Sequence, residues 1–145
     1  MRQLLILGLF LLITPVLFAL ANSPQFQLAI SPELIDLGNV QSSQVLERNF
    51  VLQNTGEEGL VIKSITVDCP CTSFQVKDGD KYEAFSSNIS ITIPPGSSIV
   101  FKLVFDSSKT KYIGKFTKYI VISSTDPKWP VKRLKMVGEI FPDKR

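Results

Sequence analysis

Histidine is missing from this sequence, and its absence removes whole classes of chemistry. The chain of 145 residues contains no histidine, two cysteines and two methionines. Histidine is the commonest general base near neutral pH and the commonest metal ligand in proteins. A Ser-His-Asp or Cys-His catalytic arrangement is therefore impossible within the chain, and so is a zinc site with imidazole ligands. Two cysteines are also too few for a structural zinc site built from four thiolates.

A large excess of charge of one sign is missing as well. The formal net charge is +3, from 16 Lys and Arg residues against 13 Asp and Glu residues. Removal of an N-terminal leader that contains Arg2 would leave a net charge of +2. Domains that bind nucleic acids or anionic membrane surfaces usually carry a clustered excess of positive charge. The composition therefore predicts neither kind of partner.

The first 21 residues have the composition of an export signal. Arg2 precedes an almost wholly apolar run that ends at Leu20, and the small residues Ala19 and Ala21 match the pattern that a signal peptidase reads. We predict a helical signal peptide at residues 1–21 and cleavage after Ala21. The mature protein would be exported, periplasmic or extracellular, without a membrane span. The alternative is an uncleaved anchor, because the run approaches the roughly 20 residues that cross a bilayer.

Long helical periodicity is absent from residues 22–145, where segments with apolar residues at every second position dominate. This alternation predicts one all-β domain, an immunoglobulin-like antiparallel β-sandwich of seven to nine strands. No helix long enough for a crossover between parallel strands is present, so parallel pairing is not expected. The polar segment 78–88 is expected to be a flexible loop. The expected strands are 26–30, 33–37, 45–53, 60–67, 73–77, 89–93, 98–106, 115–123 and 131–140.

The same alternation predicts which side chains form the core. In the segment 98–106 the large apolar side chains occupy every second position, and Lys102 lies between them on the opposite face. One face of such a strand is buried and the other is in contact with water. The predicted core comprises Phe50, Leu52, Ile62, Ile91, Phe101, Leu103, Phe105, Ile120, Ile122, Leu134 and Met136.

The turns and strand ends follow an order that resembles one known family. Asp36-Leu37-Gly38, Asn54-Thr55-Gly56, Asp68-Cys69-Pro70-Cys71-Thr72, Gly114-Lys115-Phe116 and Ser123-Ser124-Thr125-Asp126-Pro127 occur in this sequence. Their order and spacing, over roughly Ile35 to Ile140, resemble the bacterial domain-of-unknown-function family fifteen seventy-three. That family is akin to the Hydin-type (ASH) and major-sperm-protein-like immunoglobulin sandwiches. The resemblance implies an exported bacterial sandwich and supplies no established activity. Pro70 stands where the family usually has glycine.

The tripeptide Cys69-Pro70-Cys71 is the one chemically distinctive feature, and three interpretations of it stay open. An even number of cysteines in an exported chain favours a Cys69–Cys71 disulfide, whose small ring stabilises the fold little and is readily reduced. Two thiolates could instead hold a soft metal, above all Cu(I), which tolerates two or three sulfur ligands. The third interpretation is a pair of reduced, half-buried cysteines that act as small apolar side chains.

These observations predict an exported protein that is not an enzyme. The preferred hypothesis is a protein-interaction or structural module of the bacterial cell envelope, with a protein partner bound through sheet edges or end loops and no required cofactor. The alternative hypothesis is a Cu(I)-binding or thiol-redox protein that acts through Cys69 and Cys71. The preferred hypothesis rests partly on analogy, because sandwiches of this kind carry many functions.

Overall fold

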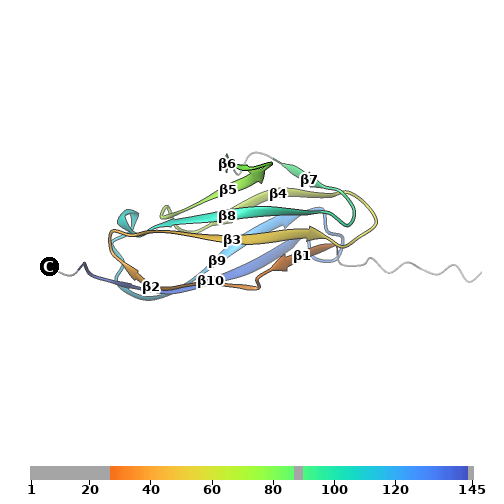
Figure 1. Cartoon of the computed structure of the whole chain (residues 1–145). Coiled ribbons are helices and arrows are strands. Elements are labelled where there is room, and N and C mark those ends of the chain that lie inside the picture. The colour runs from red at the N-terminus through yellow and green to blue at the C-terminus, as the bar shows by residue number, and fades with distance from the viewer. Residues whose placement is uncertain (1–26, 87–89, 144–145) are drawn as a thin grey trace, which may run out of the picture.

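The computed structural model describes residues 27–86 and 90–143, which form two five-stranded sheets packed face to face (Figure 1). The predicted signal peptide at residues 1–21 lies outside the described residues. Within them, no helix is long and apolar enough to cross a membrane. In chain order the elements are β1 (Leu28–Ser31), β2 (Leu34–Gln41), β3 (Val45–Asn54), β4 (Leu60–Val67), β5 (Thr72–Asp78), β6 (Lys81–Phe85), β7 (Ile91–Ile93), β8 (Ser98–Asp106), the 3-10 helix η1 (Ser107–Lys109), β9 (Gly114–Ser124) and β10 (Val131–Phe141).

The strands form the two layers of an immunoglobulin-like sandwich, as the alternation predicts. The first sheet has the order β1-β3-β8-β5-β6 and the second the order β2-β10-β9-β4-β7. The chain therefore crosses between the layers at several points, including the β4–β5 connection that contains the two cysteines. Apolar side chains from the facing sides of both sheets form a single core.

The predicted core is confirmed. Every predicted core residue is buried except Ile91, which is half-buried and packs against the others. The rings of Phe50 and Phe101 stack with their centroids 5.5 Å apart, and Phe74 meets Phe50 edge-on at 6.1 Å. Aromatic pairs in these arrangements add to the stabilisation that burial of their surface provides.

The expectation that segment 78–88 is a loop is wrong for its central part. Residues Lys81–Phe85 form β6, which pairs with β5 through a two-residue turn at Gly79-Asp80. Gly79 has a φ of 57°, a backbone conformation that glycine adopts without a steric penalty. The ring of Phe85 meets Phe101 edge-on at 5.3 Å, so one buried aromatic fastens an otherwise polar strand. This strand brings the number of strands in the described part of the chain to ten, above the predicted seven to nine.

The expectation of purely antiparallel pairing is wrong for one pair of strands. After β1 the chain passes from the first sheet to the second at Ser31-Pro32, and β2 then lies parallel to the last strand, β10. A parallel pair needs a long connection, and here the whole domain between the two strands provides it. The absence of a crossover helix therefore did not exclude parallel pairing between the first and last parts of the domain.

Buried polar side chains close one end of the sandwich, which we call the polar end. The carboxylate of Asp126 is 1% exposed and accepts four backbone N–H groups, from Gln27, Leu28, Lys128 and Trp129, at 2.9–3.0 Å. It thereby joins the start of β1 in the first sheet to the β9–β10 turn of the second. Burial by itself raises the pKa of the Asp126 carboxyl, but the four N–H donors outweigh it and hold the pKa below its ordinary value.

Asn54 is the second buried polar side chain at the polar end. It is fully buried, and its Nδ2 donates to the carbonyl oxygens of Glu58 and Ile93 at 2.6 and 2.9 Å. Its Oδ1 accepts the N–H of Gly56 at 3.0 Å, which shapes the turn between β3 and β4. In the described part of the chain no buried side-chain nitrogen or oxygen lacks a partner, so the polar end is held by complete hydrogen bonding.

Candidate functional site

The two cysteines lie at the opposite end of the sandwich, where the chain leaves β4 and enters β5. The structure joins Cys69 and Cys71 in a disulfide whose Cα atoms are 5.1 Å apart. Cys71 is 3% exposed and belongs to the core, whereas Cys69 is half-buried and Pro70 is exposed. The two residues that the bond joins therefore differ in their exposure to solvent.

Backbone hydrogen bonds hold the tripeptide against the end of β8. The N–H of Asp106 donates to the carbonyl oxygen of Cys71 at 2.8 Å, and the N–H of Thr72 donates to the carbonyl oxygen of Cys69 at 3.2 Å. The hydroxyl oxygen of Thr72 lies 3.7 Å from Cys71 Sγ. Cys71 is thus held by a hydrogen bond to its backbone carbonyl group and by a contact of its sulfur atom with Thr72.

The disulfide borders an open cavity of about 420 Å³, which we call the tripeptide cavity. Buried or half-buried apolar side chains from three strands lie on its core side, while Tyr112 lies on its exposed side at 53% exposure. The ring of Phe116 stacks on Phe105 with a centroid separation of 5.4 Å. The full lining is Asp68, Cys69, Pro70, Cys71, Phe105, Thr110, Tyr112, Lys115, Phe116, Thr117, Lys118 and Ile140.

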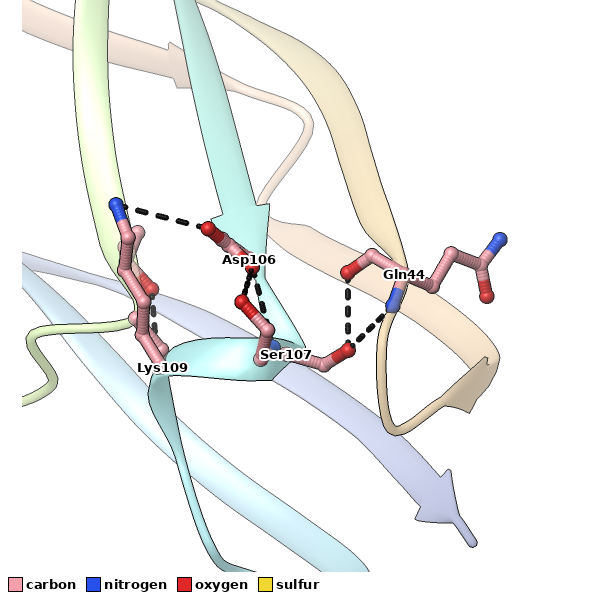
Figure 2. Close-up of polar contacts among 7 residues, drawn as sticks. Gln44, Asp106, Ser107 and Lys109 are labelled. Atoms are coloured by element: carbon pink, nitrogen blue, oxygen red, sulfur yellow. Dashed lines mark hydrogen bonds and ion pairs between the residues drawn. The ribbon is translucent and has the colours of Figure 1, made fainter. Parts of the chain in front are cut away.

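The loop that supplies Thr110 and Tyr112 is anchored at its start by Ser107. Figure 2 shows the hydroxyl of this fully buried serine against the backbone of Gln44, whose N–H donates to it at 2.9 Å. The Ser107 hydroxyl lies 2.6 Å from the carbonyl oxygen of Gln41, to which it can donate. Farther along the loop, the Tyr112 hydroxyl donates to the carbonyl oxygen of Lys115 at 2.7 Å. This side of the cavity is therefore held by specific contacts.

Charge around the tripeptide cavity is mixed, with an excess of lysine. Lys115 and Lys118 line it together with a single carboxylate, Asp68. Beside it, the Ser108 hydroxyl donates to Asp106 at 2.6 Å and is the main cause that lowers the pKa of that carboxyl. Partial burial opposes the shift, and the Ser108 N–H and Lys109, whose Nζ lies 3.6 Å from the carboxylate, add to it (Figure 2). The carboxylate of Asp106 is thus engaged by Ser108 and Lys109 of the loop that follows it.

The sulfur ligands for a metal are both engaged in the disulfide. Across residues 27–86 and 90–143, no three His, Cys, Asp or Glu side chains cluster in a way that could hold a metal ion. Met136 is fully buried in the core and does not line the tripeptide cavity. Cu(I) binding by Cys69 and Cys71 therefore stays a prediction for the reduced protein, with thiolates as the ligands.

The cysteines stand out in the sequence, whereas the side chains that the fold brings beside them do not. Lys115 and Lys118 lie more than forty positions from Cys71 along the chain, and they reach the cavity because β9 pairs with β4. The Gly114-Lys115-Phe116 segment stands out only as part of a family pattern. No local signal connects it with the cysteines, because the connection is made by strand pairing.

The sequence from β1 to β10 matches one family model. The matching family is described as protein of unknown function (DUF1573), and the match spans residues 28–140. The chain belongs to the DUF1573 family. This confirms the resemblance drawn from the turn motifs, and it assigns no activity. No curated protein matches the chain in sequence.

Solved structures with the same fold come from several kinds of protein. A protein of unknown function from Porphyromonas gingivalis W83 is 20% identical with a TM-score of 0.63, covering 84% of this chain and 50% of that chain. This DUF1573 chain thus spans about half the length of that protein. The ASH/PapD-like domain 7 of human CEP192 is 13% identical with a TM-score of 0.58, covering 91% and 97%.

An enzyme also shares the fold. A family 123 glycoside hydrolase from Clostridium perfringens is 8% identical with a TM-score of 0.59, and the match covers 76% of this chain and 23% of that chain. At these identities the similarity shows the fold alone. Because one sandwich occurs in proteins as different as these three, the function of this DUF1573 chain has to be argued from its own surface.

Proposed function

We propose that this DUF1573 protein is an exported, non-catalytic protein-interaction module of the bacterial envelope, which binds its partner by pairing with a partner strand. One observation supports the proposal above the others: among the residues that the structure describes, the second sheet has an open edge along the last part of β4. The short strand β7 pairs only with Leu60, Val61 and Ile62. Residues 64–67 pair with β9 on one side, and no strand among the described residues pairs with them on the other.

An unpaired strand edge presents a row of backbone N–H and C=O groups to any extended chain. Recognition by strand addition uses these groups for affinity and alternate side chains for specificity. Along the open edge, Ile65 is buried in the core, whereas Thr66 is exposed and Val67 half-buried. An added partner strand would thus continue the second sheet beside small side chains, without displacing any part of the core.

Two of the other edges, at β6 and at the part of β3 that β1 does not cover, carry more of the features that protect a sheet from unwanted pairing. The outer strand β6 has the charged residues Lys81 and Glu83, and the free part of β3 has Glu47 and Arg48. Charged residues at an edge discourage the approach of another strand. On the β4 edge the one charged residue is Lys63, at the irregularity where the pairing with β9 shifts register. The β4 edge is therefore more accessible to a partner than these two.

Export supports the envelope part of the proposal. The signal-like composition of residues 1–21 and the even number of cysteines both suit an oxidising compartment outside the cytoplasm. A disulfide between Cys69 and Cys71 suits the same compartment. N-terminal sequencing of protein recovered from the envelope should begin at Asn22, and an intact Met1 would contradict cleavage.

A photo-crosslinking side chain at Thr66, introduced in the native host, tests the strand-pairing proposal. We expect a discrete crosslinked protein from Thr66 and none from Ser73, which is also exposed but lies on the internal strand β5 of the other sheet. A Thr66→Lys substitution in a variant that carries the crosslinker at Ser64 should remove the product, since lysine disfavours pairing at an edge. The matched Ser73→Lys substitution should leave it. Equal crosslinking from Thr66 and Ser73 would refute the open edge as the binding site.

A further inference from the structure

We propose that the Cys69–Cys71 disulfide is a thiol–disulfide exchange centre that oxidises thiols carrying a negative charge. This activity is separate from strand pairing at the β4 edge and goes beyond it. The tripeptide lies beside the 420 Å³ tripeptide cavity, so a small thiol has room to approach the sulfur atoms. Exchange requires such access, because the attacking thiolate must reach a disulfide sulfur.

A structural role does not account for the disulfide. Cys69 and Cys71 are separated by two positions in the sequence, so their bond closes a very short loop. In the chain-entropy model, the stabilisation that a disulfide provides grows with the length of the loop it closes. Cys71 and the strand that follows it are also held by backbone hydrogen bonds to Asp106 and Cys69. The crosslink therefore restrains a segment that other contacts already position.

The difference in exposure assigns the two sulfur atoms different roles. Both cysteines line the cavity, but Cys69 is half-buried whereas Cys71 is only 3% exposed. An incoming thiolate attacks Cys69 Sγ, and Cys71 Sγ is the leaving group. The hydroxyl of Thr72 lies 3.7 Å from Cys71 Sγ, where it can donate to the thiolate that forms. Stabilisation of the leaving thiolate favours exchange.

The charge of the cavity selects among thiols. Lys115 and Lys118 line it against one carboxylate, Asp68, so the balance of formal charge at the lining is positive. A positive lining attracts a thiolate and any carboxylate on the same molecule, and it raises the local concentration of such a ligand. The inferred substrate class is therefore a thiol with at least one carboxylate, in a small molecule or a peptide.

The exchange balances as a two-electron transfer. The first thiolate forms a bond to Cys69 Sγ while the Cys69–Cys71 bond breaks, which leaves a mixed disulfide on Cys69 and a thiolate on Cys71. A second thiolate attacks the substrate sulfur of the mixed disulfide and releases the Cys69 thiolate. Two substrate thiols become one disulfide, and the two protons that they lose balance those taken up by the cysteines. The protein is reduced by two electrons and needs an external disulfide to be oxidised again.

Reduction of the oxidised wild-type protein by glutathione, with 2-mercaptoethanol as the uncharged comparison, tests the selection by charge. At equal thiolate concentration we expect glutathione to react about threefold to tenfold faster at low ionic strength, because a positive site steers an anionic reactant. The Lys115→Gln/Lys118→Gln variant should lose this preference. Lys111→Gln is the matched control, since Lys111 is exposed on the loop just before β9 and does not line the cavity. An equal preference in all three proteins would overturn the role of the lysines.

Single-cysteine variants test which sulfur is attacked. With oxidised glutathione, Cys69 in the Cys71→Ser variant should form a mixed disulfide at least about tenfold faster than Cys71 in the Cys69→Ser variant, because exchange depends on access to the sulfur. Circular dichroism of both variants keeps a folding defect from imitating the difference. Equal rates in two folded variants would overturn the assignment. Reduction of the wild-type bond only at urea concentrations that unfold the protein would overturn the proposal as a whole.

Discussion

The two ends of this sandwich carry polar side chains of opposite kinds. At the polar end, Asp126 and Asn54 are buried and their side chains are engaged with the backbone. At the other end, Lys115, Lys118 and Tyr112 surround a cavity beside a disulfide. The first arrangement leaves no group free to act on another molecule, whereas the second leaves both charge and space.

This contrast separates structural polar residues from candidates for function. A buried carboxylate with four backbone donors is already used by the fold, and its lowered pKa reflects those donors. A lowered pKa in such a place therefore results from hydrogen bonds that stabilise the fold, although groups with shifted pKa values often mark active sites. The tripeptide cavity is a candidate functional site for a different reason: it is open to solvent and contains a disulfide and two lysines. Substitutions at the two ends of the sandwich should therefore differ in their effect on stability.

Replacement of Asp126 by alanine should have the largest effect. The substitution removes the acceptor of the buried Leu28 N–H and of the part-buried N–H groups of Gln27, Lys128 and Trp129. We expect a loss of about 3 kcal/mol in the free energy of unfolding, because unsatisfied buried donors that lose a charged partner are expensive. Urea unfolding at neutral pH measures it. Asp68→Ala is the control at the cavity end, since Asp68 is exposed, and an equal loss there would end the contrast.

Replacement of Asn54 by alanine should be the next most damaging change. The substitution removes two hydrogen bonds to the carbonyl oxygens of Glu58 and Ile93 and the acceptor for the N–H of Gly56. We expect a loss of about 2 kcal/mol, because the buried carbonyl group of Ile93 loses its donor, and the part-buried carbonyl group of Glu58 loses one as well. Asn54→Asp is informative beside it, since a carboxylate keeps the acceptor and loses both donors. A stability equal to wild type in the alanine variant would show that water replaces the side chain.

Acid should weaken the polar end through Asp126. A carboxyl whose pKa is lower in the folded than in the unfolded state stabilises the fold above the unfolded value, near 3.8. That contribution is lost as the pH falls through the folded pKa. We therefore expect the stability difference between wild type and Asp126→Asn to shrink as the pH falls below the unfolded value and through the lowered folded pKa. Asp106 and Asp143, whose pKa values are also lowered, are present in both proteins and cancel in the comparison. A difference independent of pH would contradict this account.

The alternation of apolar and polar residues along single strands was enough to predict most of the strands and the core, because it depends only on which side chains face the core. Phe101 and Phe105 could be placed in the core from their spacing alone, and both are buried. Strand β6 escaped prediction because Tyr82 and Glu83 have the polar character of a loop, while the burial of Phe85 that fixes the strand depends on Phe101 in β8. Local composition cannot report a contact of this kind.

In the candidate site, too, some features could be predicted from the sequence and others depend on tertiary packing. The two cysteines are separated by a single residue, so their chemistry could be inferred from the sequence alone. The lysines of the cavity and the difference in exposure between Cys69 and Cys71 follow from the packing of β9 against the β4–β5 connection. Asp126 was visible only as a turn residue beside Pro127, because its partners Gln27 and Leu28 lie almost a hundred positions away.

Replacement of both cysteines by serine should have the smallest effect on stability, and it is the sharpest test of the contrast between the two ends. The bond closes a very short loop, so its loss releases little entropy in the unfolded chain, and we expect a change of at most about 1.5 kcal/mol. The serine at position 71 adds a small desolvation penalty, since Cys71 is buried, and Cys71→Ala in place of serine separates that penalty from the loss of the bond. Urea unfolding of the two double variants beside oxidised and reduced wild type measures each part. A loss of several kcal/mol that is the same in the serine and alanine variants, and is reproduced by reduction of the wild type, would make the disulfide a structural element like Asp126. A small loss in the free energy of unfolding, together with exchange between the wild-type disulfide and glutathione, would support a structural role for the polar end and a chemical role for the cavity end.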